Sequence, residues 1–326
     1  MRAQKLFELV DLGPSQTCLI TDLSDIRWLT GFSGSHAWLV ARHQELFLLT
    51  DGRYVEQARA EIESHCAVVE VIECRTLAAM QKATETLTQG SATVQFQDSQ
   101  LTYQNFLALQ AELSSTLIPC DSSIKFLRRQ KDDIEIQLIG SACLIADHAL
   151  QQCVHLLSAG VTENDVRDEL EYAMRRLGAD GPSYDTIVAS GPTNSARPHH
   201  HPTGTKIENG HTVIIDVGAL VAGYHSDMTR SFVVGPMSSE QAEWYEAVRA
   251  AQQAGVEACR PGVQVSEIDA ACRRVLSQAG LEQYFTHGTG HGVGLVIHEE
   301  PFINSSGQAI LQPGDVVTVE PGLYRG

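Results

Sequence analysis

The sequence predicts two domains, an α/β domain over residues 1–125 and an α+β domain over residues 126–326. The first part alternates short apolar runs with helical patterns, which is typical of an α/β sheet. The second part combines amphipathic helices with apolar strands that end in acidic residues. A charged passage at 121–135, expected to be weakly structured, separates the two parts, and the chain is long enough for two hydrophobic cores.

Apolar runs predict the strands of the first domain, and helical periodicity between them predicts its helices. Ala37–Ala41 and Leu46–Thr50 are expected to form a hairpin around the polar residues between them. The expected strands are 17–20, 37–41, 46–50, 67–72, 92–96 and 117–120, and the expected helices are 53–62, 76–88 and 102–113.

Capping signals predict where helices of the second domain begin. Thr162 to Asp165 reads as a capping box, in which the Asp165 side chain faces the first-turn amides. Ser238 precedes another such signal. The expected helices are 132–158, one that starts at 162, 239–257 and 266–279, and the expected strands are 185–190, 211–217, 224–234, 292–298 and 315–320.

The charge balance limits the classes of partner. There are 23 Lys and Arg against 40 Asp and Glu, a net charge of −17, which disfavours nucleic acid and anionic membranes as partners. No run approaches the roughly 20 apolar residues that span a bilayer. The amphipathic N-terminus, Met1 to Glu8, is unlike a signal peptide, so a cytoplasmic location is expected. The eight cysteines lack CxxC spacing and are interpreted as reduced thiols.

Two carboxylates, Asp216 and Asp227, stand eleven residues apart at the ends of strand-like runs. Asp216 closes the apolar run 213–215, and Asp227 precedes the run 229–234. If these two runs form neighbouring antiparallel strands, both acids lie on one face of the sheet. A buried acid needs a cation because it loses its hydration. This stretch has no lysine and a single arginine, Arg230, so a metal ion is one candidate.

Two further groups extend this pattern. His291 lies in the glycine-dense segment 287–294, and Glu320 ends the apolar run 316–319. Each has an ordinary structural interpretation when taken singly, and the His199-His200-His201 run alone fits a polar loop. Taken together, three acids and one imidazole suit a hard or borderline divalent ion: manganese first, with cobalt, zinc or magnesium as alternatives.

These motifs resemble those of the Xaa-Pro peptidase family, which comprises aminopeptidase P and prolidase, the pita-bread metallopeptidases. The matching segments are IIDVGA with HSDMTRSF, HGTGHGVGLVIHEEP and PGDVVTVEPGLY. DIRWLTGFSGS and LLTDGRYVEQA are similar to the family's creatinase-like N-terminal domain, so the resemblance covers nearly the whole chain. It implies an N-terminal α/β domain followed by a pita-bread catalytic domain.

The resemblance also implies roles for individual residues. Two divalent metal ions would be held by Asp216, Asp227, His291 and Glu320, with Asp227 bridging them. His199 and His298 would lie on the substrate side, and His287 would open the glycine-rich loop near the site. The implied reaction is hydrolysis of the peptide bond before proline by a hydroxide that two metals share. His298 and His199 would hydrogen-bond the substrate carbonyl, and Glu320 would pass a proton to the proline nitrogen.

In the family, a further bridging glutamate lies one to two dozen residues beyond the position of Glu320. This chain ends at Gly326, so C-terminal truncation is expected. The alternative is a non-catalytic, peptide-binding pseudo-peptidase of the same fold. Creatinase-like amidinohydrolases share the fold without the metal ligands, and methionine aminopeptidases usually lack the N-terminal domain.

The implied partner is a peptide with proline at its second position. Both Xaa-Pro aminopeptidase and Xaa-Pro dipeptidase activity fit, and the N-terminal motifs favour the aminopeptidase. The resemblance further implies a homodimer.

Overall fold

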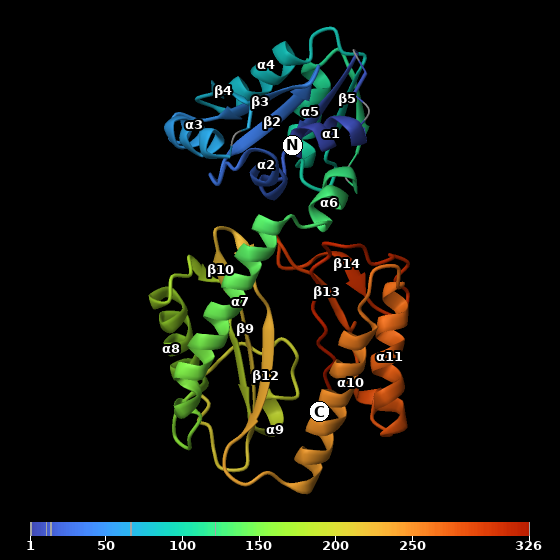
Figure 1. Cartoon of the computed structure of the whole chain (residues 1–326). Helices are drawn as coiled ribbons and strands as arrows, with labels where there is room; N and C mark the ends of the chain where they lie inside the picture. Colours follow the sequence, from blue (N-terminus) through green and yellow to red (C-terminus); the bar gives the residue numbers. More distant parts are fainter. Residues whose placement is uncertain (1, 11, 14, 66, 121, 326) are drawn as a thin grey trace. The chain divides into compact units, whose positions relative to one another are not determined.

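The computed structural model describes residues 2–10, 12–13, 15–65, 67–120 and 122–325 (Figure 1). Cys66, one of the eight cysteines, lies outside these residues. The chain divides into two compact units, Met1–Arg128 and Arg129–Gly326, and each is described by itself. Within the described part, every helix is too short or too polar to cross a membrane.

The first unit is built on a six-stranded sheet with the order β4-β3-β2-β1-β5-β6, which confirms the α/β prediction. Its antiparallel pairs are β1 with β2 and β2 with β3, and its parallel pairs are β3 with β4, β1 with β5 and β5 with β6. Its strands are β1 (Gln16–Ile20), β2 (Ala37–Arg42), β3 (Glu45–Thr50), β4 (Glu70–Glu73), β5 (Thr93–Phe96) and β6 (Thr116–Pro119). Its helices are α1 (Arg2–Val10), α2 (Leu23–Thr30), α3 (Val55–Ser64), α4 (Leu77–Leu87), α5 (Tyr103–Glu112) and α6 (Ser122–Arg129).

The charged passage 121–135 is not weakly structured, which corrects that prediction. It contains α6 and the start of α7 (Asp133–Cys153), and three of its basic side chains, Arg128, Arg129 and Lys131, are buried in ion pairs. Within the first unit Arg128 pairs with Asp25 at 2.6 Å, and within the second unit Arg129 pairs with Asp315 and Lys131 with Glu299. Buried charges persist where such partners replace their hydration. The acidic partners are far away in sequence, so the pattern of the passage resembled that of a solvated linker.

One sheet of the second unit has the order β12-β9-β8, with β9 in the middle. Its strands are β8 (Ile187–Ser190), β9 (Thr212–Val217) and β12 (Met228–Val233). On β9, Val213, Ile215 and Val217 are buried and pack in a core with α7 and α8 (Glu163–Arg176). The alternate residues Ile214 and Asp216 point to the opposite face, because successive side chains of a strand alternate. Helices therefore cover one face of β9, and its other face is left for a site.

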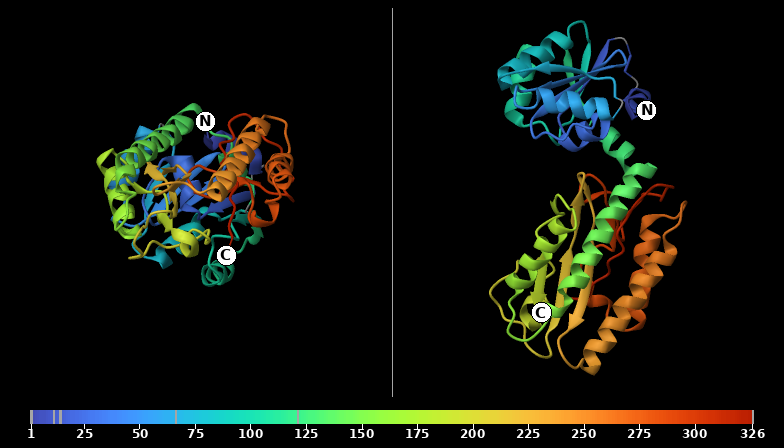
Figure 2. Two further views of the ribbon diagram at one scale, coloured as in Figure 1. Left: turned by 90° about the horizontal axis from the view of Figure 1, so that it is seen from below. Right: turned by 60° about the vertical axis from the view of Figure 1, so that its left-hand side comes forward.

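The rest of the second unit is built around α10 (Ser239–Ala258) and α11 (Val265–Gln278), which lie side by side, across the unit from α8 (Figures 1 and 2). They pack against β14 (Glu299–Ile303) and the 317–323 segment through apolar side chains. The remaining elements are η1 (Val154–Leu156), β7 (Gly181–Pro182), α9 (Gly191–Asn194), β10 (Ala219–Val221), β11 (Tyr224–His225), η2 (Glu282–Tyr284) and β13 (Gly290–Gly292).

Two predicted strands of this half differ in the structure. Residues 294–298 form a run of bends between β13 and β14, because the Gly294 amide turns back to the Val296 carbonyl at 3.2 Å. Residues 315–320 form an extended segment with isolated bridges. This segment still pairs with the β13 region, since the Thr318 and Glu320 amides donate to the carbonyls of His291 and Thr289, each at 2.8 Å.

Candidate metal centre

Pairing of β9 with β12 brings Asp216 and Asp227 together, as their spacing predicts. Asp216 stands opposite Thr229, and Asp227 comes directly before β12. The Tyr184 hydroxyl lies between the two acids, hydrogen-bonded to Asp216 and 3.0 Å from Oδ1 of Asp227. A single phenol therefore holds both carboxylates in place.

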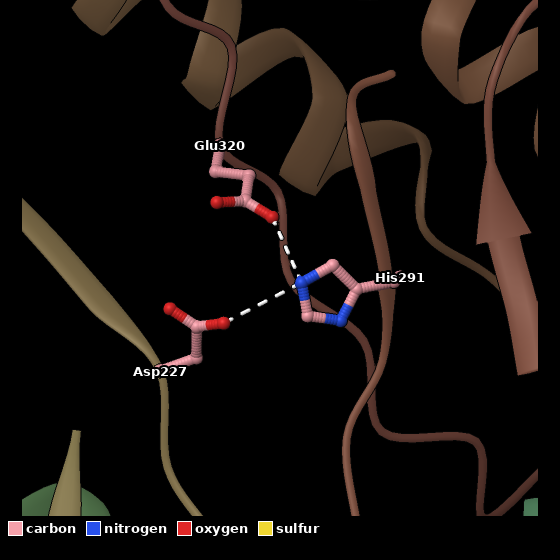
Figure 3. Close-up of side chains that lie close together, drawn as sticks. All are labelled: Asp227, His291 and Glu320. Carbon is pink, nitrogen blue, oxygen red and sulfur yellow. Dashed lines mark ion pairs between the residues drawn. The ribbon is translucent and has the colours of Figure 1, made fainter. Parts of the chain in front are cut away.

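His291 and Glu320 meet Asp227 from the other half of the unit (Figure 3). The His291 Nε2 atom lies 3.4 Å from Oδ2 of Asp227 and 3.2 Å from Oε1 of Glu320. One ligand atom from each of the three residues lies within 4.8 Å of the others. Asp216 is outside this closest trio and joins it through Tyr184 and Asp227.

Backbone pairing between β13 and the extended 315–320 segment fixes the orientation of His291. Its Nδ1 atom lies 3.0 Å from the Gly292 carbonyl oxygen, so Nε2 faces the carboxylates. The Thr318 hydroxyl accepts from the His291 amide at 3.0 Å and donates to Oε1 of Glu320 at 2.8 Å. A Cβ on Gly290 would lie 2.1 Å from the Thr318 carbonyl oxygen, so this close pairing requires glycine.

The pKa shifts at the site follow from several acids gathered near a single imidazole. Burial raises the pKa of Asp216 to about 7, with the charges of Asp227 and Glu320 adding to the increase against the hydrogen bond from Tyr184. Burial lowers the pKa of His291, but hydrogen bonds to Asp227 and Glu320 outweigh it and raise that pKa to about 10. Three carboxylates around one imidazole are a donor set that fits divalent cations, and a cation here would neutralise the acids.

The three other predicted site histidines line the same cleft, which has a volume of about 1620 Å³. His298 stacks edge-on against His291 with ring centroids 4.4 Å apart. Burial and then the charge of His291 lower the pKa of His298, so it is neutral near pH 7. His199 lies on the cleft wall and is exposed. The buried His287 Nε2 atom has no hydrogen-bond partner among the residues the structure describes.

Sequence reasoning missed several residues that hold this site. Tyr184 lies just before β8, and its local sequence matches none of the motifs that indicated the site. Thr318 lies within an apolar run and looks like an ordinary strand residue. His200, although next to His199, is buried and binds Glu163 at 2.9 Å rather than facing a metal. Their roles depend on contacts between segments that are distant in sequence.

Replacing Tyr184 with phenylalanine is expected to weaken divalent-ion binding about 10- to 100-fold, the usual cost of removing an outer partner of metal ligands. The substitution keeps the ring and removes only the hydroxyl that joins Asp216 to Asp227. Calorimetric titration with Mn²⁺ would measure the change, with the exposed Tyr172→Phe as the matched control. Equal affinity for Tyr184→Phe and the native protein would contradict this role.

Divalent ions are expected to raise Tm more at pH 8 than at pH 6. With the pKa of Asp216 raised to about 7, the metal-free folded state holds a proton that the unfolded chain releases near pH 4. Stability of the metal-free protein therefore falls as pH rises through that range. Metal binding needs the ionised carboxylate, so the ion does not compete with a proton once Asp216 has ionised. The metal-induced shift is therefore larger at the higher pH.

Thermal unfolding with and without Mn²⁺ at both pH values would test this expectation. Asp216→Asn serves as the comparison, because it removes the titrating carboxyl and should reduce the pH dependence of the shift. A metal-induced shift that is equal at pH 6 and pH 8 in the native protein would contradict the prediction.

Comparison with known proteins gives consistent matches for both units. Residues 137–326 match the model of metallopeptidase family M24, and residues 2–130 match the creatinase/prolidase N-terminal domain. The chain is 37% identical over 325 residues to the uncharacterized peptidase YqhT of Bacillus subtilis, covering 99% of this chain and 91% of that protein. A solved Xaa-Pro dipeptidase from Bacillus anthracis has a TM-score of 0.93 and 34% identity, covering 99% of this chain and 90% of the other. An X-Pro aminopeptidase from Thermotoga maritima has a TM-score of 0.89 and 30% identity, with 99% and 90% covered.

Proposed function

Because this chain belongs to metallopeptidase family M24, we propose that it hydrolyses the peptide bond preceding proline in short peptides. The expected fold, a creatinase-type N-terminal domain followed by a pita-bread domain, is confirmed by the family and structure matches. The observation that carries the substrate class is the likeness along the whole chain to solved Xaa-Pro peptidases. The acid and imidazole cluster in the cleft supplies the matching chemistry.

Asp216, Asp227, His291 and Glu320 are the residues that would hold the divalent ions, which the family resemblance implies to be two, with Asp227 shared between them. Support comes from the position of Asp227, which contacts His291 on one side and the Tyr184–Asp216 pair on the other. Divalent ions bound there would supply a nucleophile near neutral pH and polarise the substrate carbonyl. Carboxylate and imidazole donors favour manganese, with cobalt, zinc or magnesium as alternatives.

The histidines of the cleft are proposed to act on the substrate. His298 is neutral near pH 7 and lies against His291, where it could donate a hydrogen bond to the scissile carbonyl. His199, on the 195–211 segment, is also proposed to donate a hydrogen bond to the substrate carbonyl. His287 also lines the cleft, and it is proposed to lie near the bound substrate. Glu320 would pass a proton to the proline nitrogen through its second oxygen.

The absence of an N–H on the proline nitrogen gives the proposed selectivity a physical reason. A site shaped for that ring has no donor to satisfy at that atom. Between the two family activities, we propose Xaa-Pro aminopeptidase, as the N-terminal motifs favour, with Xaa-Pro dipeptidase as the alternative. Rates on an Xaa-Pro dipeptide and on the same peptide extended by one residue would separate them. A homodimer and a cytoplasmic location are also proposed.

Metal analysis and hydrolysis, measured together on the full-length protein, test the proposal. We expect about two divalent ions per chain after incubation with Mn²⁺, and release of the N-terminal residue from an Xaa-Pro-Yaa peptide. A peptide with alanine in place of proline is the matched control and should be cleaved far more slowly. A protein that binds no metal and cleaves neither peptide would instead be the non-catalytic, peptide-binding form.

A further inference from the structure

His199 lies in an irregular segment between α9 and β9, where no regular structure holds it in the cleft. Residues 195–211 contain turns, bends and one isolated bridge, and His199 itself is exposed. An exposed side chain such as His199 on an irregular segment would sample several positions, and fixing it costs conformational entropy. If His199 acts on substrate, something else in the structure must fix its backbone.

A buried carboxylate next to this segment makes six hydrogen bonds. Glu163, the first residue of α8, is fully buried. Its Oε1 atom accepts from the Ser190 amide at 2.7 Å, the Ser190 hydroxyl at 3.0 Å and the Asn194 side chain at 2.9 Å. Its Oε2 atom accepts from His200 Nε2 at 2.9 Å, the Thr203 amide at 3.0 Å and the Thr203 hydroxyl at 2.9 Å.

These six bonds join four parts of the second unit at a single side chain. They connect the start of α8, the end of β8, α9 and the segment on both sides of His201. Backbone bonds add to the connection, since the Glu163 amide donates to Thr205 at 3.1 Å and the Asn164 amide to Thr203 at 3.1 Å. A buried carboxylate this well satisfied is costly to disturb, because any displaced donor would lose its partner.

This network gives the adjacent residues His199 and His200 different surroundings. Both histidines line the cleft, but His200 is 5% exposed and its Nε2 atom bonds to Glu163, whereas the side chain of His199 is exposed. Anchoring His200 leaves its chain neighbour little freedom to move. Glu163 is fully buried and so cannot itself contact the substrate.

We propose that Glu163 is a positioning residue that, through His200, holds His199 at its place in the cleft. This inference rests on the proposed peptidase function. A preorganised side chain lowers the barrier by removing the cost of ordering it during reaction, and a misplacement of about 1 Å can cost about 100-fold in rate. Glu163 would therefore affect the reaction without touching the metal ligands or the substrate.

The test is a double-mutant cycle on the full-length, metal-loaded protein with an Xaa-Pro-Yaa peptide. Glu163→Gln keeps the size of the side chain but replaces one acceptor oxygen with a donor, which breaks half of the network. We expect kcat/KM to fall about 10- to 100-fold, mainly in kcat, with the metal content unchanged. In the His199→Ala background the same substitution should cost less than about threefold, because the residue that it positions is already gone.

A matched control separates positioning from simple loosening of α8. Asp165→Ala removes the capping box of the same helix, where Asp165 accepts from the Thr162 amide at 2.9 Å, and leaves the Glu163 network intact. This variant should be less stable and keep its kcat/KM. Because Glu163→Gln could fail to fold, the pair His200→Gln and His200→Leu provides a second route. The glutamine retains a donor for Glu163 and should keep most of the kcat that the leucine loses.

The possible outcomes can be told apart. Additive losses in the cycle, loss of metal from Glu163→Gln, or an equal loss in Asp165→Ala would overturn the positioning role. Equal kcat values for His200→Gln and His200→Leu would overturn it as well. A native protein that fails to cleave the peptide would instead contradict the proposed function.

Discussion

The His291→Ala variant is expected to lose divalent-ion binding and to lose at least about 1000-fold in kcat/KM. His291 provides the imidazole of the trio, and its Nε2 atom lies 3.2 Å from Glu320 and 3.4 Å from Asp227. Without it, carboxylates face one another with no nitrogen ligand between them. A bound metal supplies several kcal/mol of charge stabilisation in hydrolysis, and each 1.4 kcal/mol corresponds to about tenfold in rate.

Elemental analysis of the purified variant and its kcat/KM on an Xaa-Pro-Yaa peptide would measure both effects. His155→Ala is a suitable control, because His155 is exposed in η1, and its Nδ1 atom lies 2.7 Å from the nearby Gln152 carbonyl oxygen. Native metal content and native kcat/KM in His291→Ala would rule out the trio as the metal centre.

The His298→Ala variant is expected to lose about 100- to 1000-fold in kcat while keeping its metal. His298 packs edge-on against His291, with its ring 4.4 Å away, yet stands outside the trio of ligands. Its lowered pKa keeps it neutral and able to donate one hydrogen bond near pH 7. Removing a donor aimed at a developing oxyanion typically costs this much in kcat.

The comparison of kcat, KM and metal content distinguishes this role from ligation. His298→Gln keeps a donor at a similar distance and is expected to recover part of the lost kcat. An alanine variant with full kcat would show that His298 does not act in the reaction. A variant that lost its metal would place His298 among the ligands instead.

Part of the site could be predicted from the alternation of buried and partly exposed side chains along β9. The apolar run before Asp216 predicted a strand, and the eleven-residue spacing to Asp227 predicted an antiparallel neighbour. Both predictions are confirmed by the pairing of β9 with β12. Local patterns sufficed here, because strand periodicity alone decides which side chains share a face.

Local patterns failed in the second half of the site for a related reason. The 292–298 segment is apolar and flanks a histidine, so it resembled a strand, yet it bends at Gly294 through a local hydrogen bond to Val296, and distant residues also contact it. The Gly294 carbonyl accepts from the His225 amide at 2.9 Å, and Glu299 pairs with Lys131, which lies 168 residues earlier. Neither contact can be predicted from the residues next to it in the sequence.

The sequence by itself determined the family, the order of most strands and helices, and the acids and histidines available for chemistry. These follow from residue type and from periodicities of two and 3.6, which are local properties of a chain. The tertiary structure alone decided that Tyr184 joins Asp216 to Asp227 and that Glu163 bonds to His200. It also decided that Arg128, Arg129 and Lys131 of the charged passage are buried in ion pairs. Each of these depends on desolvated polar groups finding partners far along the chain, and only folding brings such partners together.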